Sequence, residues 1–420
     1  MGQMRRRAFL VLSGGAALAA CTGAEYPPAP PYLVPGGSGP LAGLFGPPGS
    51  SSRPVAILLP LSGPRADLGQ PMLQAAQLAL ADPGSPAIIP ADTTGTAEGA
   101  SVAARGALAQ GAGLILGPLT APETAAVAPA ATAASVPVLA FTNTTAAARP
   151  GVWTLGITPG QQVRRLLAYA QEQGRGTVAA LLPESQFGHA MADALTEAAQ
   201  QRGLPPPEIR FHGGGMAAIS GAVRQLSNYE QRWGPVQQRI KEARAQGTPE
   251  GRREAEQLTR SSVPPPPFDA LLLGDTGDAL AELASLLPYY FVGPPSVQIL
   301  GPALWATSGS AASQVRGAWF AAPDPAARAN FEQAFAARYG GRPPGPADLA
   351  FDAASIARAV ASQGYAQAAL VNPDGFSGAD GWLRLLPDGQ VQRGLAIFQV
   401  EAGGPRIISP APTSAASAEI

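Results

Sequence analysis

The chain contains very little cysteine, histidine and lysine. Its 420 residues include one cysteine, two histidines (His189 and His212) and a single lysine, Lys241. One cysteine cannot form an intramolecular disulfide, and no Cys-x-x-Cys or His-x-x-x-His spacing is present, so we expect no metal site of the common kinds. Charged residues are 14% of the chain and the formal net charge is −1, which argues against a nucleic-acid partner.

Sequence motifs of the common enzymes are also missing. No Gly-x-Ser-x-Gly elbow, phosphate-binding P-loop or dinucleotide-binding Gly-x-Gly-x-x-Gly follows a predicted strand. We expect His189 at the exposed start of a helix and His212 in a loop before three glycines. We therefore expect no catalytic residue, no cofactor and no enzymatic activity. The hydrophobic content of 46% predicts a folded, core-rich protein.

The single cysteine, Cys21, lies in the stretch LAACTG, behind a segment typical of an export signal. Met4 is followed by three arginines, and then by an apolar run that is too short to span a bilayer comfortably. The residues Leu-Ala-Ala-Cys resemble the lipobox of bacterial lipoproteins. The resemblance implies that residues 1–20 are a signal peptide and that Cys21 becomes an acylated N-terminus held in a lipid bilayer. A buried free thiol is the alternative interpretation.

Thr22 stands directly after this cysteine, where an aspartate would favour retention in the inner membrane. The lipoprotein resemblance therefore implies an anchor in the outer membrane, with the protein in the periplasm. The arginines suit either the Sec or the twin-arginine export route, and both stay open. Residues 21–53 are rich in proline and glycine and predict an extended, lipidated tether, and residues 409–420 predict a disordered tail.

From residue 54 onwards, short apolar runs alternate with segments of helix-forming residues. The runs show little polar alternation, which is typical of strands buried on both faces of a parallel sheet. The predicted strands are 55–61, 87–92, 113–118, 136–141, 178–183, 268–275, 297–302 and 317–323. The predicted helices are 71–81, 97–110, 123–134, 161–173, 188–202, 276–287, 326–339 and 347–362. This alternation predicts a doubly wound α/β fold with enough units for two lobes.

Residues 217–262 interrupt this rhythm, because they are polar, rich in arginine and strongly helix-forming. The Gly-Thr-Pro-Glu stretch at 247–250 predicts the end of one helix and the start of another. We therefore expect a helical hairpin inserted in one lobe. Its Tyr229 and Trp233 are residue types enriched at the centre of protein interfaces, so they are candidates for docking a partner. A solvated decoration without a partner is the alternative.

Four stretches carry a resemblance to a known family: VAILLPLSGPRADLGQPMLQAAQLAL (55–80), GAGLILGPLTAPETAAVAPAATAASVPVLAFTNTT (111–145), LLPESQFGHAMADALTEAAQQRG (181–203) and GWLRLLPDGQVQRGLAIFQV (381–400). They resemble the type 1 periplasmic binding proteins of the leucine/isoleucine/valine class. The resemblance covers residues 54–405 and implies two Rossmann-like lobes with parallel sheets, joined by a three-segment hinge. Lobe 1 would hold 54–156 and 297–372, and lobe 2 would hold 157–296 and 373–408. The hinge segments would lie near 156–160, 292–297 and 372–377.

The same resemblance implies a ligand cleft between the lobes, beyond the carboxyl ends of the strands. The implied cleft residues are Ser62, Thr120, Thr142, Thr144, Phe187, Asp275 and Trp305. The three threonines match positions that hold the α-carboxylate of an amino acid, and Asp275 lies near the acid for its α-ammonium group. Phe187 stands where these proteins often carry tyrosine. Serine and threonine at such positions are also ordinary helix caps, which is the alternative to ligand binding.

A narrower resemblance, to lipoprotein activators of penicillin-binding proteins, is carried by DALLLGDTGDALAELASLLPYYFVGPPSVQILGPALW (269–305). It implies an outer-membrane-anchored periplasmic lipoprotein that binds and activates a penicillin-binding protein, which is a peptidoglycan synthase. The alternative is the solute-binding protein of an ABC importer for branched-chain or other amino acids, whose cleft would hold a small amino-acid-like ligand. A ligand sensor without a transporter is a third interpretation.

Overall fold

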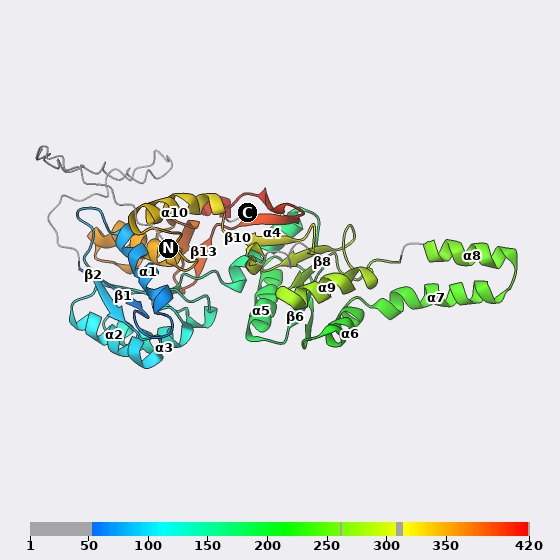
Figure 1. The fold of residues 1–420 in the computed structure, drawn as a ribbon, viewed down its shortest axis with the longest axis horizontal. Helices are drawn as coiled ribbons and strands as arrows, with labels where there is room; N and C mark the ends of the chain where they lie inside the picture. The colour runs from blue at the N-terminus through cyan, green and yellow to red at the C-terminus, as the bar shows by residue number, and fades with distance from the viewer. Residues whose placement is uncertain (1–52, 261–262, 308–313, 419–420) are drawn as a thin grey trace, which may run out of the picture. The chain divides into compact units, whose positions relative to one another are not determined.

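The computed structural model describes residues 53–260, 263–307 and 314–418. The expected signal peptide (1–20), the expected acylation site Cys21 and all of the expected tether (21–53) except Arg53 lie outside these residues. Within them the chain forms two large sheets covered by helices, which confirms the predicted α/β fold (Figure 1). No helix in this part of the chain combines the length and the hydropathy needed to cross a membrane.

The first sheet has five parallel strands in the order β2-β1-β3-β4-β5. They are β1 (Val55–Leu59), β2 (Ile88–Asp92), β3 (Leu114–Leu116), β4 (Val138–Ala140) and β5 (Val152–Thr154). The connecting helices are α1 (Ala66–Ala79), α2 (Ala97–Ala109) and α3 (Ala121–Ala133). Strands β1, β3 and β4 are buried along their whole length, as continuous apolar runs predict.

The second sheet has seven strands in the order β15-β14-β10-β9-β8-β6-β7. Strands β6 to β10 are parallel, whereas β14 runs antiparallel to β10 and β15 antiparallel to β14. The strands are β6 (Val178–Pro183), β7 (Glu208–His212), β8 (Ala270–Leu273), β9 (Gln298–Gly301), β10 (Trp319–Ala322), β14 (Ala396–Glu401) and β15 (Gly404–Ser409). The helices of this lobe are α4 (Pro159–Glu172), α5 (Gln186–Gln201), α6 (Met216–Leu226) and α9 (Gly277–Tyr289).

A small antiparallel sheet completes the first lobe. It consists of β11 (Phe376–Gly378), β12 (Gly381–Leu385) and β13 (Val391–Arg393). Its Leu383, Leu385 and Val391 join one hydrophobic core with strands β1 and β3 and with helices α1, α10 (Pro325–Tyr339) and α11 (Ala347–Val360). The short helix α12 (Gln367–Leu370) leads from α11 to this sheet.

The lobe boundaries differ from those expected. Strands β9 and β10 belong to the second sheet, so residues 298–322 lie in the second lobe, and residues 376–393 pack on the first. The chain therefore crosses between the lobes at 155–158, 323–324 and 394–395. Only the expected hinge near 156–160 coincides with a crossing, and the segments near 292–297 and 372–377 are loops within a lobe. A strand that is apolar on both faces carries no local sign of which parallel sheet it joins.

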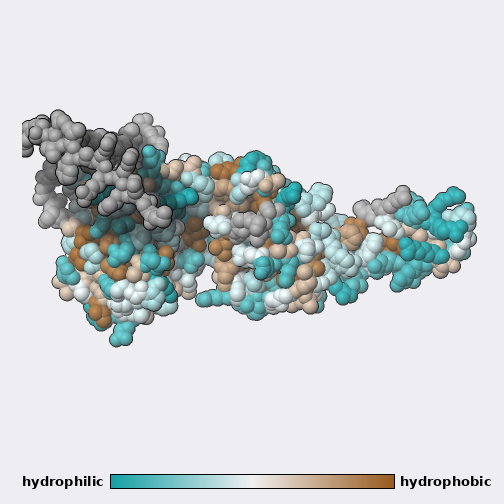
Figure 2. Space-filling model, in the orientation of Figure 1, coloured by the Kyte–Doolittle hydropathy of each residue, from teal (hydrophilic) through white to brown (hydrophobic). Residues whose placement is uncertain are grey.

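The predicted insertion is a helical hairpin of α7 (Tyr229–Ala245) and α8 (Pro249–Arg260), preceded by α6. The two helices share a small core of Ile240, Ala243 and Ala255, against which Trp233 packs. Thr248 caps α8, because its hydroxyl oxygen accepts a hydrogen bond from Gly251 N at 3.0 Å. Figure 1 shows the hairpin in green with the two helices side by side, and Figure 2 shows that its surface is mainly hydrophilic.

The C-terminal residues expected to be disordered are structured in part. The hydroxyl of Ser409 accepts a hydrogen bond from Arg165 Nη2 at 2.6 Å, and the carbonyl of Pro410 accepts another from the same nitrogen at 3.3 Å. Ala411 packs on the core of the second lobe, and a short helix, α13 (Ala415–Ala418), follows. The composition of the tail predicts disorder, but the contacts that hold it come from Arg165 on the distant helix α4.

Several helices in both lobes begin at side-chain caps. The side-chain oxygens of these caps accept a hydrogen bond from a first-turn N–H: Thr96 for α2, Thr120 for α3, Thr158 for α4, Ser185 for α5 and Asp324 for α10. Prolines in the first turn of α3, α4 and α10 support the same starts. In a parallel sheet the strands end where the following helices begin, and ligands of such folds bind beyond these ends. Of these caps, Thr120 and Asp324 line the cavity described below.

Candidate functional site

The described residues line an open cavity of about 1120 Å³ beside the carboxyl ends of the parallel strands. Its lining combines residues of the first lobe with residues at the start of α5 and in the 3₁₀ helix η3 (Ala303–Ala306) of the second. Of the expected cleft residues, Thr120, Thr142, Thr144 and Phe187 line the cavity. Ser62, Asp275 and Trp305 are not among its lining residues, and each makes contacts elsewhere.

Thr120 already holds a carboxylate of the protein itself. Its backbone N–H and its hydroxyl donate hydrogen bonds to Glu123 Oε2 at 3.0 and 2.6 Å. The other carboxylate oxygen of Glu123 accepts a hydrogen bond from the Thr93 hydroxyl at 2.6 Å. Glu123 is 1% exposed and lies in the first turn of α3, where the helix dipole favours a negative charge. The donors that would bind a ligand carboxylate are therefore satisfied internally.

Thr142 and Thr144 lie in a tight turn after β4, on the wall of the cavity. The Thr142 hydroxyl oxygen accepts a hydrogen bond from Thr144 N at 3.2 Å, and its carbonyl accepts one from Gly156 N at 3.1 Å. A Cβ at Gly156 would lie 2.7 Å from the Thr142 carbonyl oxygen, so this close approach requires glycine. The turn is thereby fixed against the first crossing between the lobes.

Phe187 lines the cavity from the first turn of α5. Ser185 caps this helix by accepting a hydrogen bond from Gly188 N at 3.1 Å. The Phe187 ring also packs against the hydrophobic core that α4 and α5 share. It is an apolar part of the cavity wall, and it lacks the hydroxyl that a tyrosine would offer to a ligand.

Asp275 is bound to His212, which ends the unpredicted strand β7 and does not lie in a loop. His212 Nε2 lies 3.0 Å from Asp275 Oδ2, and His212 Nδ1 lies 2.9 Å from the Gly213 carbonyl oxygen. Both partners accept hydrogen bonds when Asp275 is ionised, so both ring nitrogens donate and the imidazole is cationic. Burial acts to lower the pKa of His212, but the hydrogen bonds to Asp275 and Gly213 raise it overall. The Asp275 carboxylate, which was expected to bind a ligand's ammonium group, is thus paired with His212.

Trp305 is a core residue behind the cavity wall. It is 1% exposed, and its Nε1 donates a hydrogen bond to the Asp275 carbonyl oxygen at 2.9 Å. Its neighbours Ala303 and Leu304 in η3 line the cavity. A Cβ at Gly301 would lie 2.2 Å from the indole ring, so the last residue of β9 must be glycine. Trp305 therefore supports the wall without lining it.

Ser62 belongs to a turn that binds Asp92. The Ser62 hydroxyl donates to Asp92 Oδ2 at 2.5 Å, and the backbone N–H groups of Leu61 and Ser62 donate to Oδ1 at 2.9 and 3.2 Å. Burial acts to raise the pKa of Asp92, but these hydrogen bonds and one from Thr94 lower it overall. Ser62 is consequently a structural residue of the β1–α1 turn.

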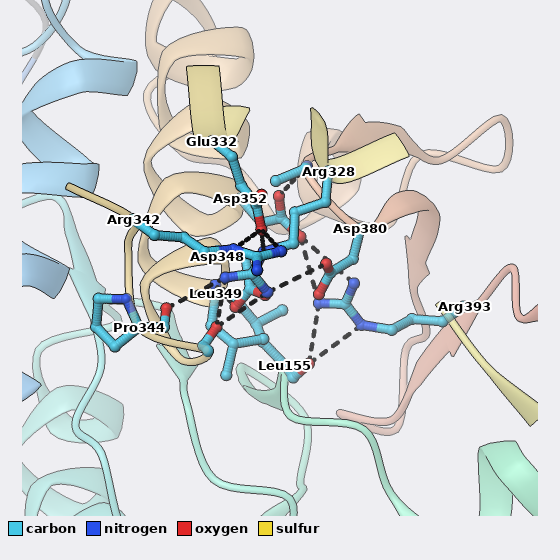
Figure 3. Close-up of polar contacts among 12 residues, drawn as sticks. Leu155, Arg328, Glu332, Arg342, Pro344, Asp348, Leu349, Asp352, Asp380 and Arg393 are labelled. Carbon is cyan, nitrogen blue, oxygen red and sulfur yellow. Dashed lines mark hydrogen bonds and ion pairs between the residues drawn. The ribbon is translucent and has the colours of Figure 1, made fainter. Parts of the chain in front are cut away.

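An unexpected cluster of aspartates and arginines forms part of the cavity wall (Figure 3). Arg328, Asp348 and Asp380 all line the cavity. Arg328 Nη1 donates to Asp348 Oδ2, Arg328 Nε donates to Glu332 Oε1 at 3.0 Å, and Arg328 Nη1 lies 4.0 Å from Asp380 Oδ1. Burial, and then the charge of Asp380, raise the pKa of Asp348 well above its usual value, although Arg328 opposes this.

Asp352 and Arg393 continue this cluster into the core. Their side chains are 0% and 1% exposed, and Arg393 Nη1 and Nη2 each lie 3.4 Å from Asp352 Oδ2. Arg393 also donates to the Leu155 carbonyl oxygen, from Nε at 3.2 Å and from Nη2 at 3.0 Å. Ala379 N donates to Asp352 Oδ1 at 2.5 Å. Burial raises the pKa of Asp352 to about 7, because it outweighs the opposing effect of Arg393.

The expected docking residues lie on an exposed aromatic surface at the base of the hairpin, made of Tyr229, Trp233, Tyr289 and Phe291. The Tyr229 ring is stacked with the rings of Tyr289 and Phe291 at centroid distances of 6.3 Å each. The Trp233 ring lies 5.4 Å from that of Phe291. Tyr289 is 65% exposed and Phe291 is 43% exposed, so the rings are accessible to a partner.

Arg232 fixes the backbone beneath this aromatic surface. It is 8% exposed, and its guanidinium donates to the carbonyl oxygens of Ser227 at 2.6 Å, Pro264 at 2.9 Å and Tyr290 at 2.7 Å. One side chain therefore ties the start of α7, the segment after α8 and the end of α9 to each other. The backbone beneath the aromatic rings is thereby held in place.

The chemistry of the described residues suits recognition. Among them, no group of three or more His, Cys, Asp and Glu side chains could hold a metal ion. The two histidines are bound to acceptors, His189 to Glu184 and His212 to Asp275 and Gly213. The cavity offers apolar walls, threonine hydroxyls and one charged side formed by Arg328, Asp348 and Asp380.

Comparison with known proteins gives one family and a consistent set of folds. The family model for "Periplasmic binding protein" matches residues 53–405. The crystal structure of a candidate branched-chain amino acid ABC transporter from Rhodospirillum rubrum matches with a TM-score of 0.65 and 19% identity, covering 85% of this chain and all of that chain. The C-domain of LpoA (YraM) from Haemophilus influenzae, a regulator of PBP1A, matches with a TM-score of 0.60 and 18% identity, covering 84% and 99% of the two chains. At these identities the likeness shows the fold alone.

A curated relative matches over a shorter stretch. The uncharacterized protein RP748 from Rickettsia prowazekii (strain Madrid E) is 26% identical over 175 residues, which are 41% of this chain and 47% of that protein. The match therefore spans about half the length of this relative.

Proposed function

The chain belongs to the periplasmic binding protein family, and from this premise we propose that it is a lipoprotein that binds and activates a penicillin-binding protein in the periplasm. It recognises its partner and catalyses no reaction. Activation requires that it bind the active conformation of the synthase more tightly than the inactive one. The C-domain of LpoA, a regulator of PBP1A, has this fold and supports the proposal by analogy.

The main support for the proposal is that the two groups expected to bind the charges of an amino acid, Thr120 and Asp275, are already bound to side chains of the protein. A free α-amino acid would have to bring its carboxylate to Thr120 and its ammonium group to Asp275. Glu123 and His212 already occupy these groups, and Asp275 is not a lining residue of the cavity. Displacing either one would leave a buried charge without its partner, at a cost of about 3–5 kcal/mol. This cost is expected to exclude the tight amino-acid binding that an importer needs.

The solute-binding protein of an ABC importer is the second candidate, and the cavity favours it. A volume of about 1120 Å³ is ample for a small molecule. Phe141 and Phe187 would pack on an apolar part of the ligand, and Thr142 and Thr144 would bind a polar part. A ligand held in this way would not be recognised through the charges of a free amino acid.

The aromatic surface is the docking site that we propose for the penicillin-binding protein. Tyrosine and tryptophan dominate the energetically important centres of protein interfaces, and here Arg232 holds their backbone in place. Tyr229 and Trp233 would supply the buried part of the contact, with Tyr289 and Phe291 beside them. The hydrophilic hairpin would form the rim of the interface.

An acylated Cys21 in the outer membrane would set the geometry of this encounter. A stretched segment of the length of residues 21–53 reaches roughly 100 Å, at ~3.3 Å per residue. This reach would let the binding domain approach a synthase held in the inner membrane. Acylation is tested by mass spectrometry of the mature protein, in which an unmodified thiol at Cys21 would contradict the proposal.

Binding to purified penicillin-binding proteins of the same organism tests the docking site. We expect the full-length lipoprotein to bind one of them, and Tyr289→Ala to weaken binding at least tenfold without unfolding the protein. Val102→Ala is the matched control, because Val102 is 56% exposed on α2 and distant in sequence from the aromatic surface. Unchanged binding by Tyr289→Ala and by Trp233→Ala would remove the aromatic surface from the proposal, and binding to no synthase would reject the proposal itself.

A thermal-shift screen with the natural amino acids separates the two candidate functions. A ligand at 100 times its Kd stabilises the folded state by about 2.7 kcal/mol. We expect no such shift for wild type with any free amino acid. A clear, saturable shift with one of them would favour the importer function.

A further inference from the structure

The first-lobe ends of all three crossings between the lobes are tied to one face of α11. Asp348 and Asp352 lie on this face four residues apart, which is about one helical turn. Each accepts hydrogen bonds from a different arginine, Arg328 or Arg393. The crossings are the segments 155–158, 323–324 and 394–395. Through these arginines, the two aspartates therefore connect segments that are far apart in the sequence.

Arg393 connects the first and the third crossings. It is the last residue of β13, directly before the third crossing, and its guanidinium donates to the carbonyl oxygen of Leu155 in the first. The same guanidinium is paired with Asp352. Loss of the pair would therefore release both crossings from α11 together.

Arg328 holds the second crossing. Asp324 ends this crossing and caps α10 by accepting a hydrogen bond from Ala326 N at 2.9 Å. Arg328 lies one turn into α10 and donates to Asp348 and to the carbonyl oxygen of Pro344, the latter at 3.2 Å. The start of α10, and with it the end of the crossing, is thereby fixed to α11.

The charges at this junction are closely balanced. Asp348, Asp352 and Asp380 are 4%, 0% and 6% exposed, and the guanidinium groups of Arg328 and Arg393 face them. While Asp348 or Asp352 carries a proton, two negative charges meet two positive charges. Once that proton leaves, three carboxylates face two guanidinium groups in a largely buried site, where like charges repel more strongly than in water.

Few other charges reach this cluster. Glu332 of α10 binds Arg328 and is also bound by Arg342 at 3.2 Å, so these two residues form a neutral pair at its rim. Helix α1, which also packs on α11, carries Asp67 as its single charged residue, and Asp67 makes no hydrogen bond or ion pair with the three carboxyl groups. Strands β3 and β11 carry no charge.

We propose that Asp348, Asp352 and Asp380 form a proton-operated latch, which fixes the three crossings while the cluster holds a proton and loosens them when that proton leaves. The latch also changes the cavity, because Arg328, Asp348 and Asp380 form one of its walls. The raised pKa of Asp352, about 7, places the change near neutral pH. This conformational property goes beyond the proposed function, and its test needs no partner protein.

Hydrogen exchange of the full-length protein at about pH 6 and about pH 8.5 tests the latch, once the rates are corrected for intrinsic chemistry. In wild type, protection of the peptides that cover 155–158, 323–324 and 394–395 should fall about tenfold more than that of peptides from α2. Asp352→Asn removes one ionisable carboxyl group and leaves two carboxylates for two arginines. Its crossings should keep the same protection at both pH values.

Asp82→Asn is the matched control. The Asp82 carboxylate pairs with Arg358 of α11 at 2.5 Å, outside the aspartate cluster. Because Asp82 is largely exposed, the Asp82→Asn variant should respond to pH as wild type does. Should Asp352→Asn fail to fold, Asp380→Asn removes a charge from the same cluster and should likewise abolish the pH response. An equal pH response in wild type and in the folded Asp352→Asn or Asp380→Asn variant would overturn the latch, as would loosening of α2 to the same extent as the crossings.

Discussion

The imidazole of His212 and the carboxylate of Asp275 form an ion pair 3.0 Å apart, with neither residue more than 5% exposed. The pair joins the end of β7 to the turn after β8, across the intervening strand β6, at the edge where the resemblance places a ligand's ammonium group. His212 thus stands where the ammonium group of an amino acid was predicted to bind, and Glu123, bound to Thr120, stands where its carboxylate was predicted to bind.

Removing the histidine should be costly. His212→Ala leaves the Asp275 carboxylate buried without its cation, and we expect a loss of about 3 kcal/mol in the free energy of unfolding, measured by urea denaturation. His189→Ala is the control, because the pair of His189 with Glu184 is exposed by more than half on both sides. That change should cost less than about 1 kcal/mol, and equal losses in the two variants would contradict the importance of the buried pair.

The His212 pair should also make stability depend on pH. The pKa of His212 is raised above the usual 6.5 in the folded state. The contribution of His212 to stability is therefore fully present below pH 6.5 and is lost as the pH rises through the folded-state pKa. The free energy of unfolding of wild type should therefore fall more steeply above neutral pH than that of His212→Gln. Parallel curves for the two proteins, measured in the same buffers, would show that the histidine is not held in its charged form.

Arg232 should control the base of the hairpin. Arg232→Ala leaves three carbonyl oxygens without their donor, and we expect a loss of about 3 kcal/mol and faster proteolysis of the hairpin. Arg232→Lys should recover only part of this loss, because an ammonium group cannot reproduce the guanidinium geometry. Arg239→Ala, which breaks an exposed pair with Glu254, should change stability by less than about 1 kcal/mol.

Two glycine substitutions should have opposite effects. A methyl group at Gly301 would overlap the Trp305 ring, so Gly301→Ala should destabilise the protein by about 2 kcal/mol or more and shift its tryptophan fluorescence. A Gly301→Ala variant as stable as wild type would contradict this expectation, because Trp305 would then have to move easily.

Gly221 lies inside α6 with open space around it, so Gly221→Ala should stabilise the helix by about 0.5–1 kcal/mol.

The strands and helices of the fold could be predicted largely from local patterns. Each predicted apolar run contains a strand, and each predicted helix overlaps an observed one, because burial on both faces and helix caps leave signals within a few residues. The predicted runs leave out β5, β7 and the strands from β11 to β15. β5 is only three residues long, and β7 alternates exposed charged residues with partly buried ones at the edge of its sheet. The assignment of β9 and β10 to a sheet failed because it depends on contacts between distant segments.

The candidate site was less predictable, because its decisive contacts join residues that are distant in the sequence. Asp275 was expected to be free for a ligand, but His212 reaches it from 63 positions earlier in the chain. The role of Thr120 as the cap of α3 could be predicted from the sequence, because a threonine followed three residues later by a glutamate is the pattern of a capping box. Asp348 and Asp352, four residues apart in a predominantly apolar helix, are a sequence sign of buried charge. Their partner Arg393 could not have been identified from sequence spacing.

The rate of glycan polymerisation by a purified penicillin-binding protein of the same organism, with and without this protein, tests the central proposal most directly. We expect the wild-type protein to increase the rate severalfold, and Tyr289→Ala to lose most of this stimulation while keeping its fold. A rate that is the same with and without the wild-type protein, for every such synthase of the organism, would contradict the account.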